Sequence, residues 1–180
     1  QKKCGVHISR GIRPDDNTVV SVEMIEAVGA EFLPGYFQVL GERLKPDGKL
    51  VLQAITVPDQ RYEHARKQVD FIKRYIFPGG CLPSNSVIAK HVSENTNMQI
   101  IGLEDITKDY ALTLAHWRQR FLANTHTYLA QGLSSEFLLM WDYYLAYCQG
   151  GFMERVIHTS QTLIAKPNFR DTPSIGTPAP

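Results

Sequence analysis

The sequence has few of the features that mark a membrane-spanning, secreted or metal-binding chain. No apolar run approaches the roughly 20 residues that cross a bilayer, and the polar start QKKCGVHISR lacks the apolar core of a signal peptide. The three cysteines, Cys4, Cys81 and Cys148, form no CxxC pair, which disfavours a disulfide framework and a structural zinc site. We therefore expect a cytoplasmic chain without a bound metal.

An excess of charge of one sign is also missing. The 180 residues carry a formal net charge of +1, which gives no electrostatic basis for binding nucleic acid. Neither HExxH nor GxSxG occurs, and the spacing of the Ser, His and Cys residues suggests no nucleophile and base pair. With 43% hydrophobic residues, the chain has the composition of one ordinary globular domain.

Hydrophobic patterning predicts a βαβ unit near the start of the chain. Residues 19–22 and 49–57 are predicted buried strands, and residues 32–44 repeat apolar side chains with a helical period that ends at KPDG, residues 45–48. Such a crossover favours parallel strands in a sheet covered on both faces. Further strands are predicted at 98–103 and 156–165, the last one alternating, and further helices at 62–75, 84–95, 108–129 and 134–150.

Polar side chains at the ends of the first two predicted strands are candidate working residues. Glu23 and Glu26 follow the first strand, where open α/β sheets bind ligands. Either these carboxylates take part in catalysis, with Glu26 the first candidate, or they are solvated acids beside a helix start. Gln53, late in the second strand, needs hydrogen-bond partners, which can lie at the ligand-binding end of the sheet or on neighbouring backbone.

Apolar side chains in two later segments allow two interpretations. Phe77 and Leu82 lie in a loop with two prolines and two glycines, and aromatic residues crowd the predicted helix 134–150. Loop residues of this kind line a ligand pocket or pack beneath the loop. Aromatic residues at helical spacing belong to the core or contact an apolar ligand.

Five segments, in this order along the chain, resemble the motifs of one known family: SVEMIEAVG (21–29), LKPDG (44–48), YIFPGG (75–80), DYALTL (109–114) and YYLAYC (143–148). Together they resemble the cyclopropane-fatty-acyl-phospholipid synthase and mycolic acid methyltransferase family, over residues 19–166. The resemblance implies a class I methyltransferase fold, an α/β Rossmann-like sheet with an antiparallel last strand. It also implies a helical lipid-binding cap, formed by residues 62–95 and 108–150. Residues 1–17 are interpreted as the remnant of a preceding unit, and the Pro-, Ser- and Thr-rich 167–180 as a disordered tail.

The resemblance also implies an activity, the transfer of a methyl group from S-adenosylmethionine to the double bond of an unsaturated phospholipid acyl chain. In this family a bound bicarbonate removes a proton to close a cyclopropane. By position, Glu26 and Tyr110 match residues that hold bicarbonate, Ile55 matches a backbone contact, and Gln53 stands where many members have histidine. Phe77, Leu82, Tyr144 and Cys148 match segments that line the acyl tunnel.

The front of the chain departs from the family. The ExGxGxG turn, the acidic residue and the reactive cysteine that precede residue 19 in relatives do not occur in residues 1–17, and Cys4 has no matching context. The chain thus looks like the last four strands of a seven-stranded sheet, which would bind S-adenosylmethionine poorly by itself. Its first strand would be an edge able to pair with another chain, giving a homo-oligomer.

Two other functions stay open from the sequence. The chain could belong to a related enzyme that leaves a methyl- or methylene-branched lipid, since Gln53 cannot titrate like histidine. It could instead be a non-catalytic lipid-binding or dimerising module. We expect the contact with a membrane to be peripheral, since the acyl substrate lies in a bilayer.

Overall fold

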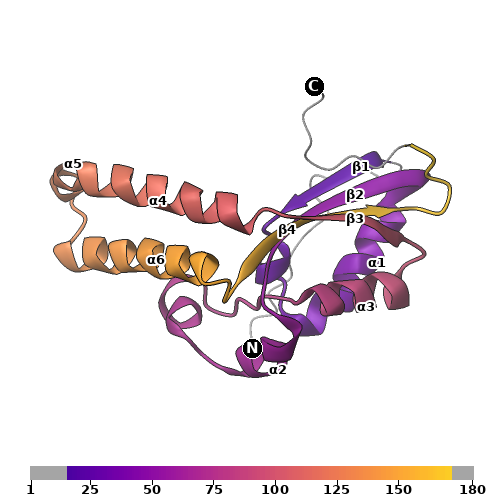
Figure 1. Cartoon of the computed structure of the whole chain (residues 1–180), viewed down its shortest axis with the longest axis horizontal. Helices are drawn as coiled ribbons and strands as arrows, with labels where there is room; N and C mark the ends of the chain where they lie inside the picture. Colours follow the sequence, from indigo (N-terminus) through magenta and orange to yellow (C-terminus); the bar gives the residue numbers. More distant parts are fainter. Residues whose placement is uncertain (1–15, 172–180) are drawn as a thin grey trace.

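The structure, a computed structural model, describes residues 16–171 as a four-stranded sheet with helices on one face and a projecting helical hairpin (Figure 1). Its strands are β1 (Asp16–Val22), β2 (Leu44–Thr56), β3 (Gln99–Asp105) and β4 (His158–Ala165), in the order β1-β2-β4-β3. β1 and β2 are parallel, whereas β4 is antiparallel to both β2 and β3. The predicted α/β sheet with an antiparallel last strand is therefore confirmed.

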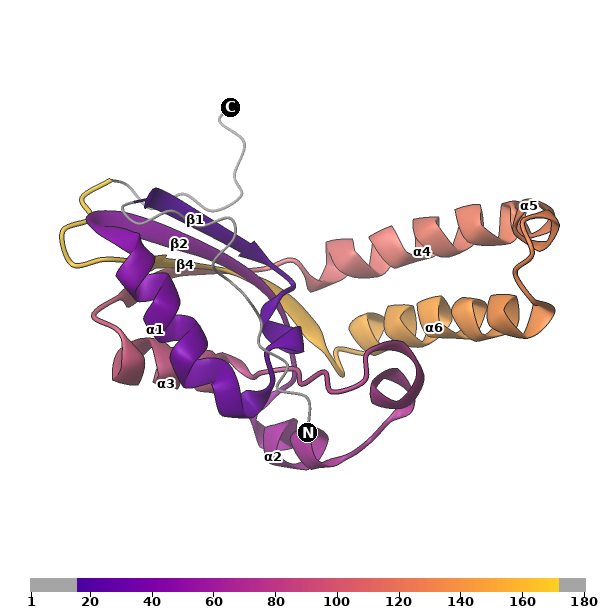
Figure 2. The ribbon, with the colours of Figure 1, turned by 180° about the vertical axis from the view of Figure 1, so that it is seen from behind.

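The helices α1 (Leu33–Arg43) and α3 (Asn85–Asn95) cover one face of this sheet (Figures 1 and 2). The core between them contains alternate residues of the strands and the inner faces of the helices: Val19, Leu50, Leu52, Ala54, Phe37, Leu40, Ile88 and Val92. α3 begins at its N-cap Ser84, whose hydroxyl accepts a hydrogen bond from the amide of Val87. We expected residues 84–95 in the lipid-binding cap, but α3 belongs to the helical layer because its apolar face is buried there.

The opposite face of the sheet differs from the prediction. Within residues 16–171 the outward side chains of β1, Val20 and Val22, are 63% and 57% exposed, so the expectation of a sheet covered on both faces is wrong for this strand. β4 is a central strand that α4 also contacts, and it is buried along nearly its whole length. Its predicted alternation is therefore wrong as well.

The predicted helix 62–75 is in fact two short elements. α2 (Asp59–Lys67) ends before an extended Gln68, and a single π-turn, η4 (Ile72–Ile76), follows. The ammonium of Lys73 donates hydrogen bonds to the carbonyls of Ala65, at 2.5 Å, and Gln68, at 2.9 Å. These bonds satisfy carbonyls that a further helical turn would have used, which explains the end of the helix.

The predicted helix 108–129 is also divided. α4 (Thr107–Ala123) and α5 (Thr125–Ala130) meet at Asn124, whose side chain donates a 2.7 Å hydrogen bond to the carbonyl of Arg120. Asparagine often ends a helix by bonding backbone in this way. The break turns the chain back toward the sheet.

α4 and α6 (Ser135–Met153) form a hairpin that projects beyond the ends of β1 and β2, with α5 at its tip (Figure 1). Ala111, Leu114, Leu145 and Phe152 are buried between them or at their base. No helix within residues 16–171 is both long and apolar enough to cross a membrane.

The two ends of the described chain lie beside the sheet. Asp16 and Asn17 open β1, whereas the other residues of the expected remnant, Cys4 included, lie outside the described residues. Beyond β4, the amides of Lys166 and Asn168 donate hydrogen bonds to the carbonyls of Gly48 and Pro46. These bonds hold the start of the expected tail against the sheet, and the rest of it, 172–180, is outside the description.

Candidate functional site

A sharp turn after β1 places two carboxylates over the end of the sheet. Glu23 has φ of +49°, a left-handed conformation that is uncommon for a residue other than glycine. Its amide donates a 2.9 Å hydrogen bond to the carbonyl of Gln53, which ties the turn to β2. The short 3₁₀ turns η2 (Ile25–Ala27) and η3 (Ala30–Phe32) then lead into α1.

Glu23 is the centre of a hydrogen-bonded chain of four side chains. One carboxylate oxygen accepts a 2.9 Å bond from the amide nitrogen of Gln53, and the other accepts a 2.6 Å bond from the Tyr110 hydroxyl. The amide oxygen of Gln53 in turn accepts a 2.9 Å bond from Gln161. The interpretation of Glu23 as a solvated loop acid is therefore wrong, and the partners of Gln53 include side chains of both neighbouring elements.

Sequence reasoning missed Gln161 and the central position of Glu23. Gln161 lies in β4, directly opposite Gln53 in the antiparallel register. The available signal was its polar side chain in the middle of a predicted strand, which is close to the argument that selected Gln53.

Glu26 is part-buried and only partly satisfied. Its Oε1 accepts a 2.6 Å hydrogen bond from the amide of Ile55, whereas its Oε2 is buried without a hydrogen-bond partner among the described residues. Burial raises the pKa of Glu26 to about 7, with the charge of Glu23 adding to the effect and the Ile55 amide opposing it. Glu26 can thus gain or lose a proton near neutral pH, as a general acid or base must.

Tyr110 is held as a protonated hydrogen-bond donor. Burial and its hydrogen bond to Glu23 raise the pKa of the Tyr110 hydroxyl well above its usual range. Its ring packs at 4.7 Å, centroid to centroid, against Phe152 of α6. The hairpin therefore positions the hydroxyl over the end of β1.

The residues expected to line an acyl tunnel lie near this chain of polar groups. The Phe77 ring, 57% exposed, meets the Tyr144 ring edge-on at 6.2 Å. Tyr144 and Cys148 are partly buried in one cluster with Ile55 and Tyr110, and burial raises the pKa of Cys148 to about 12, which keeps its thiol protonated. Leu82 is half-buried on the same loop as Phe77. Polar and apolar candidates thus meet at the base of the hairpin.

The polar groups of the site leave few atoms free to bond a small oxyanion. The Ile55 amide, the Gln53 amide and the Tyr110 hydroxyl already donate to the two carboxylates. The unpaired Oε2 of Glu26 and the second N–H of the Gln53 amide are left to bond an anion. Oε2 donates a hydrogen bond when Glu26 is protonated, and it accepts one from an anion that carries an O–H group when Glu26 is ionised. A small oxyanion that carries an O–H group could therefore bond here with Glu26 either neutral or ionised.

Comparisons with known proteins agree on one family. The family model described as mycolic acid cyclopropane synthetase matches residues 9–162. The chain is 40% identical over 149 residues to tuberculostearic acid methyltransferase UfaA1 of Mycobacterium tuberculosis, and 33% identical over 162 residues to cyclopropane-fatty-acyl-phospholipid synthase of Escherichia coli. These alignments cover 82% and 87% of this chain but 35% and 39% of the relatives.

Solved structures show the same similarity. The mycolic acid cyclopropane synthase CmaA1, in complex with SAH and CTAB, superposes with a TM-score of 0.77 at 26% identity. The match covers 87% of this chain and 57% of that one. The chain thus spans between about a third and somewhat over half of the length of the proteins it matches.

Proposed function

Because the chain belongs to the mycolic acid cyclopropane synthetase family, we propose that it forms the C-terminal part of a methyltransferase that uses S-adenosylmethionine. We infer that the enzyme acts on the double bond of unsaturated fatty acyl chains of phospholipids, as a cyclopropane-fatty-acyl-phospholipid synthase does. The observation that carries the proposal is Glu26, a part-buried carboxyl with one unpaired oxygen, whose other oxygen bonds the amide of Ile55, a residue of the cluster with Tyr110 and Tyr144.

S-adenosylmethionine would supply the methyl group, and bicarbonate, where bound, would accept the proton that leaves. The π electrons of the double bond form the new carbon–carbon bond as the carbon–sulfur bond breaks, which leaves positive charge on the acyl chain. The carboxylate of Glu23, that of Glu26 when it is ionised, and the faces of Phe77 and Tyr144 can stabilise that charge. Loss of a proton from the transferred methyl group closes the ring.

Gln53 favours a product other than a cyclopropane. An amide neither takes up nor releases a proton near neutral pH, and the 40% identical relative is named a tuberculostearic acid methyltransferase rather than a cyclopropane synthase. The alternative is therefore an enzyme that leaves a methyl- or methylene-branched chain. Mass spectrometry of the lipid product of the longer enzyme separates the two, since a cyclopropane product rules out this alternative.

A non-catalytic module is the third possibility, and the exposed β1 residues Val20 and Val22 support it. An edge strand with apolar outer residues can pair with a second copy. Measured methyl transfer by the 180-residue chain would exclude this function. Titration with S-adenosylhomocysteine, combined with light scattering, shows whether the chain binds the nucleotide and as which oligomer.

The enzyme proposal is tested by methyl transfer from labelled S-adenosylmethionine to vesicles of unsaturated phospholipid. We expect Glu26→Gln in the longer enzyme to reduce transfer by about a hundredfold, while Glu154→Gln, an exposed matched control, stays at the wild-type rate. Equal rates in both variants would contradict the role of Glu26. Peripheral membrane contact is measured in the same experiment by vesicle co-sedimentation, and a cytoplasmic location stays a prediction.

A further inference from the structure

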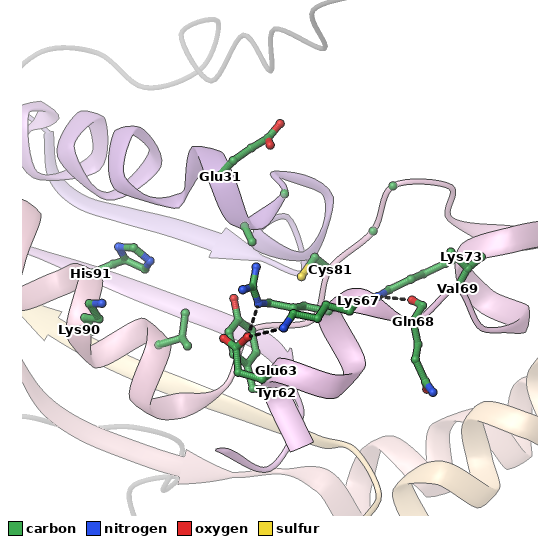
Figure 3. Close-up of a pocket in the computed structure, with 16 residues that line it drawn as sticks. Glu31, Tyr62, Glu63, Lys67, Gln68, Val69, Lys73, Cys81, Lys90 and His91 are labelled. Carbon is green, nitrogen blue, oxygen red and sulfur yellow. Dashed lines mark hydrogen bonds and ion pairs between the residues drawn. The ribbon is translucent and has the colours of Figure 1, made fainter. Parts of the chain in front are cut away.

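A basic hollow of about 700 Å³ lies on the other side of the turn that carries Glu26. Its walls come from η3, α2, α3 and the loop 79–81 (Figure 3). Four permanent cations line it, Arg66, Lys67, Lys73 and Lys90, against two carboxylates. This local excess is notable in a chain whose net charge is only +1.

The carboxylates leave much of this positive charge unpaired. Glu63 contacts Arg66 at 2.9 Å and Lys67 at 3.7 Å, so one acid is shared by two cations. Glu31 points away from the other labelled side chains (Figure 3). The backbone amide of Lys73 donates to the Asp70 carboxylate, whereas its ammonium, among the described residues, bonds to the neutral carbonyls of Ala65 and Gln68, which do not balance its charge.

The loop that lines the hollow also favours a bulky anion. Gly79, Gly80 and Cys81 have no large side chains, which lets a ligand approach the backbone. Burial raises the pKa of the Cys81 thiol, with the nearby charges of Lys73 and Arg66 opposing the effect, so the thiol adds no negative charge to the hollow.

One loop connects the hollow with the candidate catalytic site. The amide of Cys81 donates a 2.8 Å hydrogen bond to the carbonyl of Glu26. Phe77, at the start of the same loop, contacts Tyr144. A single ligand with an apolar chain and an anionic end could therefore contact both.

We propose that this hollow binds a phosphate group, that of the phospholipid whose acyl chain lies beside Phe77 and Tyr144. Lysine and arginine side chains are the usual ligands of phosphate, and an open hollow admits a headgroup larger than the phosphate itself. The identity of the phosphate carrier rests on the proposed function, whereas the anion site rests on the charges alone. Phosphatidylglycerol, whose headgroup leaves the lipid with a net negative charge, is the probe of choice.

Calorimetric titration of the 180-residue chain with dihexanoyl phosphatidylglycerol, below its micelle concentration, tests the site. We expect the double variant Lys67→Glu/Lys90→Glu to bind about tenfold more weakly. The matched double variant Lys108→Glu/Arg120→Glu makes the same change of net charge on α4 and should bind as the wild type does. Circular dichroism checks that both variants are folded, and equal affinities in all three proteins would overturn the proposal.

Two further measurements identify the phosphate carrier. Inorganic phosphate should compete with the lipid but bind more weakly; binding as tight as that of the lipid would overturn the headgroup assignment in favour of a free-phosphate site. Methyl transfer by the longer enzyme separates this inference from the proposed function. Lipid binding that depends on the two lysines, without any methyl transfer, would support the phosphate site and refute the proposed enzyme function. The phosphate site alone would be refuted if, at subsaturating lipid, Glu26→Gln abolishes transfer and the two lysine changes leave it intact.

Discussion

The carboxylate of Glu23 accepts a 2.6 Å hydrogen bond from the hydroxyl of Tyr110, which lies 87 residues later in the chain. This bond joins the turn after β1 to the base of the helical hairpin. It also directs the hydroxyl toward Glu23. The Tyr110 hydroxyl can therefore donate a hydrogen bond to another ligand only after this bond breaks. Glu23 is therefore a positioning residue for Tyr110.

Tyr110→Phe should remove that bond and leave Glu23 with Gln53 as its remaining side-chain donor. A hydrogen bond to a charged group contributes about 1.5 to 3 kcal/mol, so we expect the free energy of unfolding to fall by roughly 1.5 kcal/mol because the site is only part-buried. Methyl transfer by the longer enzyme should fall about tenfold. Urea unfolding and rate measurements check both, with the exposed Tyr75→Phe as the control; equal losses in the two variants would refute the role of Tyr110.

The sheet could be predicted from the sequence because its signals are local. The apolar runs at 19–22 and 49–57 and the helical period between them are set by neighbours in the chain. The break after α2 could not be predicted, because it depends on which backbone carbonyls accept hydrogen bonds from the ammonium of Lys73. The exposure of Val20 and Val22 likewise depends on which elements cover β1, and not on the strand itself.

The candidate site was predicted only in part, for a related reason. Glu26 and Gln53 were found because polar side chains at the ends of apolar strands are unusual. The bonds from Tyr110 to Glu23 and from Gln161 to Gln53 span 87 and 108 residues, so they follow from strand order and register. A one-residue shift of β4 would point Gln161 to the other face of the sheet.

Stability should depend on pH through Glu26. In the unfolded chain this carboxyl titrates near the ordinary glutamate value of 4.5, whereas burial raises its pKa to about 7 in the folded chain. Between these values the folded state binds more protons than the unfolded state, so the free energy of unfolding should fall as pH rises, by about 3 kcal/mol in total. Urea unfolding at pH 5 and pH 8 measures the change.

Glu26→Gln should remove this pH-dependent contribution, because the amide does not titrate. The exposed Glu154→Gln should keep the wild-type dependence. If the stability difference between wild type and Glu26→Gln is the same at pH 5 and pH 8, the pKa of Glu26 is not raised in the folded chain.

The Gln161–Gln53 bond should appear as an energetic coupling. Gln53→Leu removes a donor to Glu23 and an acceptor for Gln161, whereas Gln161→Leu removes only the bond to Gln53. A double-mutant cycle should therefore give an interaction energy of about 1 kcal/mol. A second cycle that combines Gln53→Leu with Gln131→Leu at the exposed tip of the hairpin should be additive. Additivity in the first cycle would mean that the two amides do not stabilise one another.

The hairpin offers the last prediction, because its two long helices are joined by an ion pair. The guanidinium of Arg118 donates two hydrogen bonds to Asp142, at 2.6 and 3.2 Å, and the two side chains are 37% and 28% exposed. A two-pronged contact of this kind is worth roughly 0.5 to 1 kcal/mol at partial exposure. Asp142→Asn should therefore increase hydrogen exchange in α4 and α6 and leave β2 and β4 unchanged, while Glu154→Gln should alter neither. Faster exchange in the sheet as well would show that the hairpin and the sheet unfold as one unit, in which case this ion pair stabilises the whole chain.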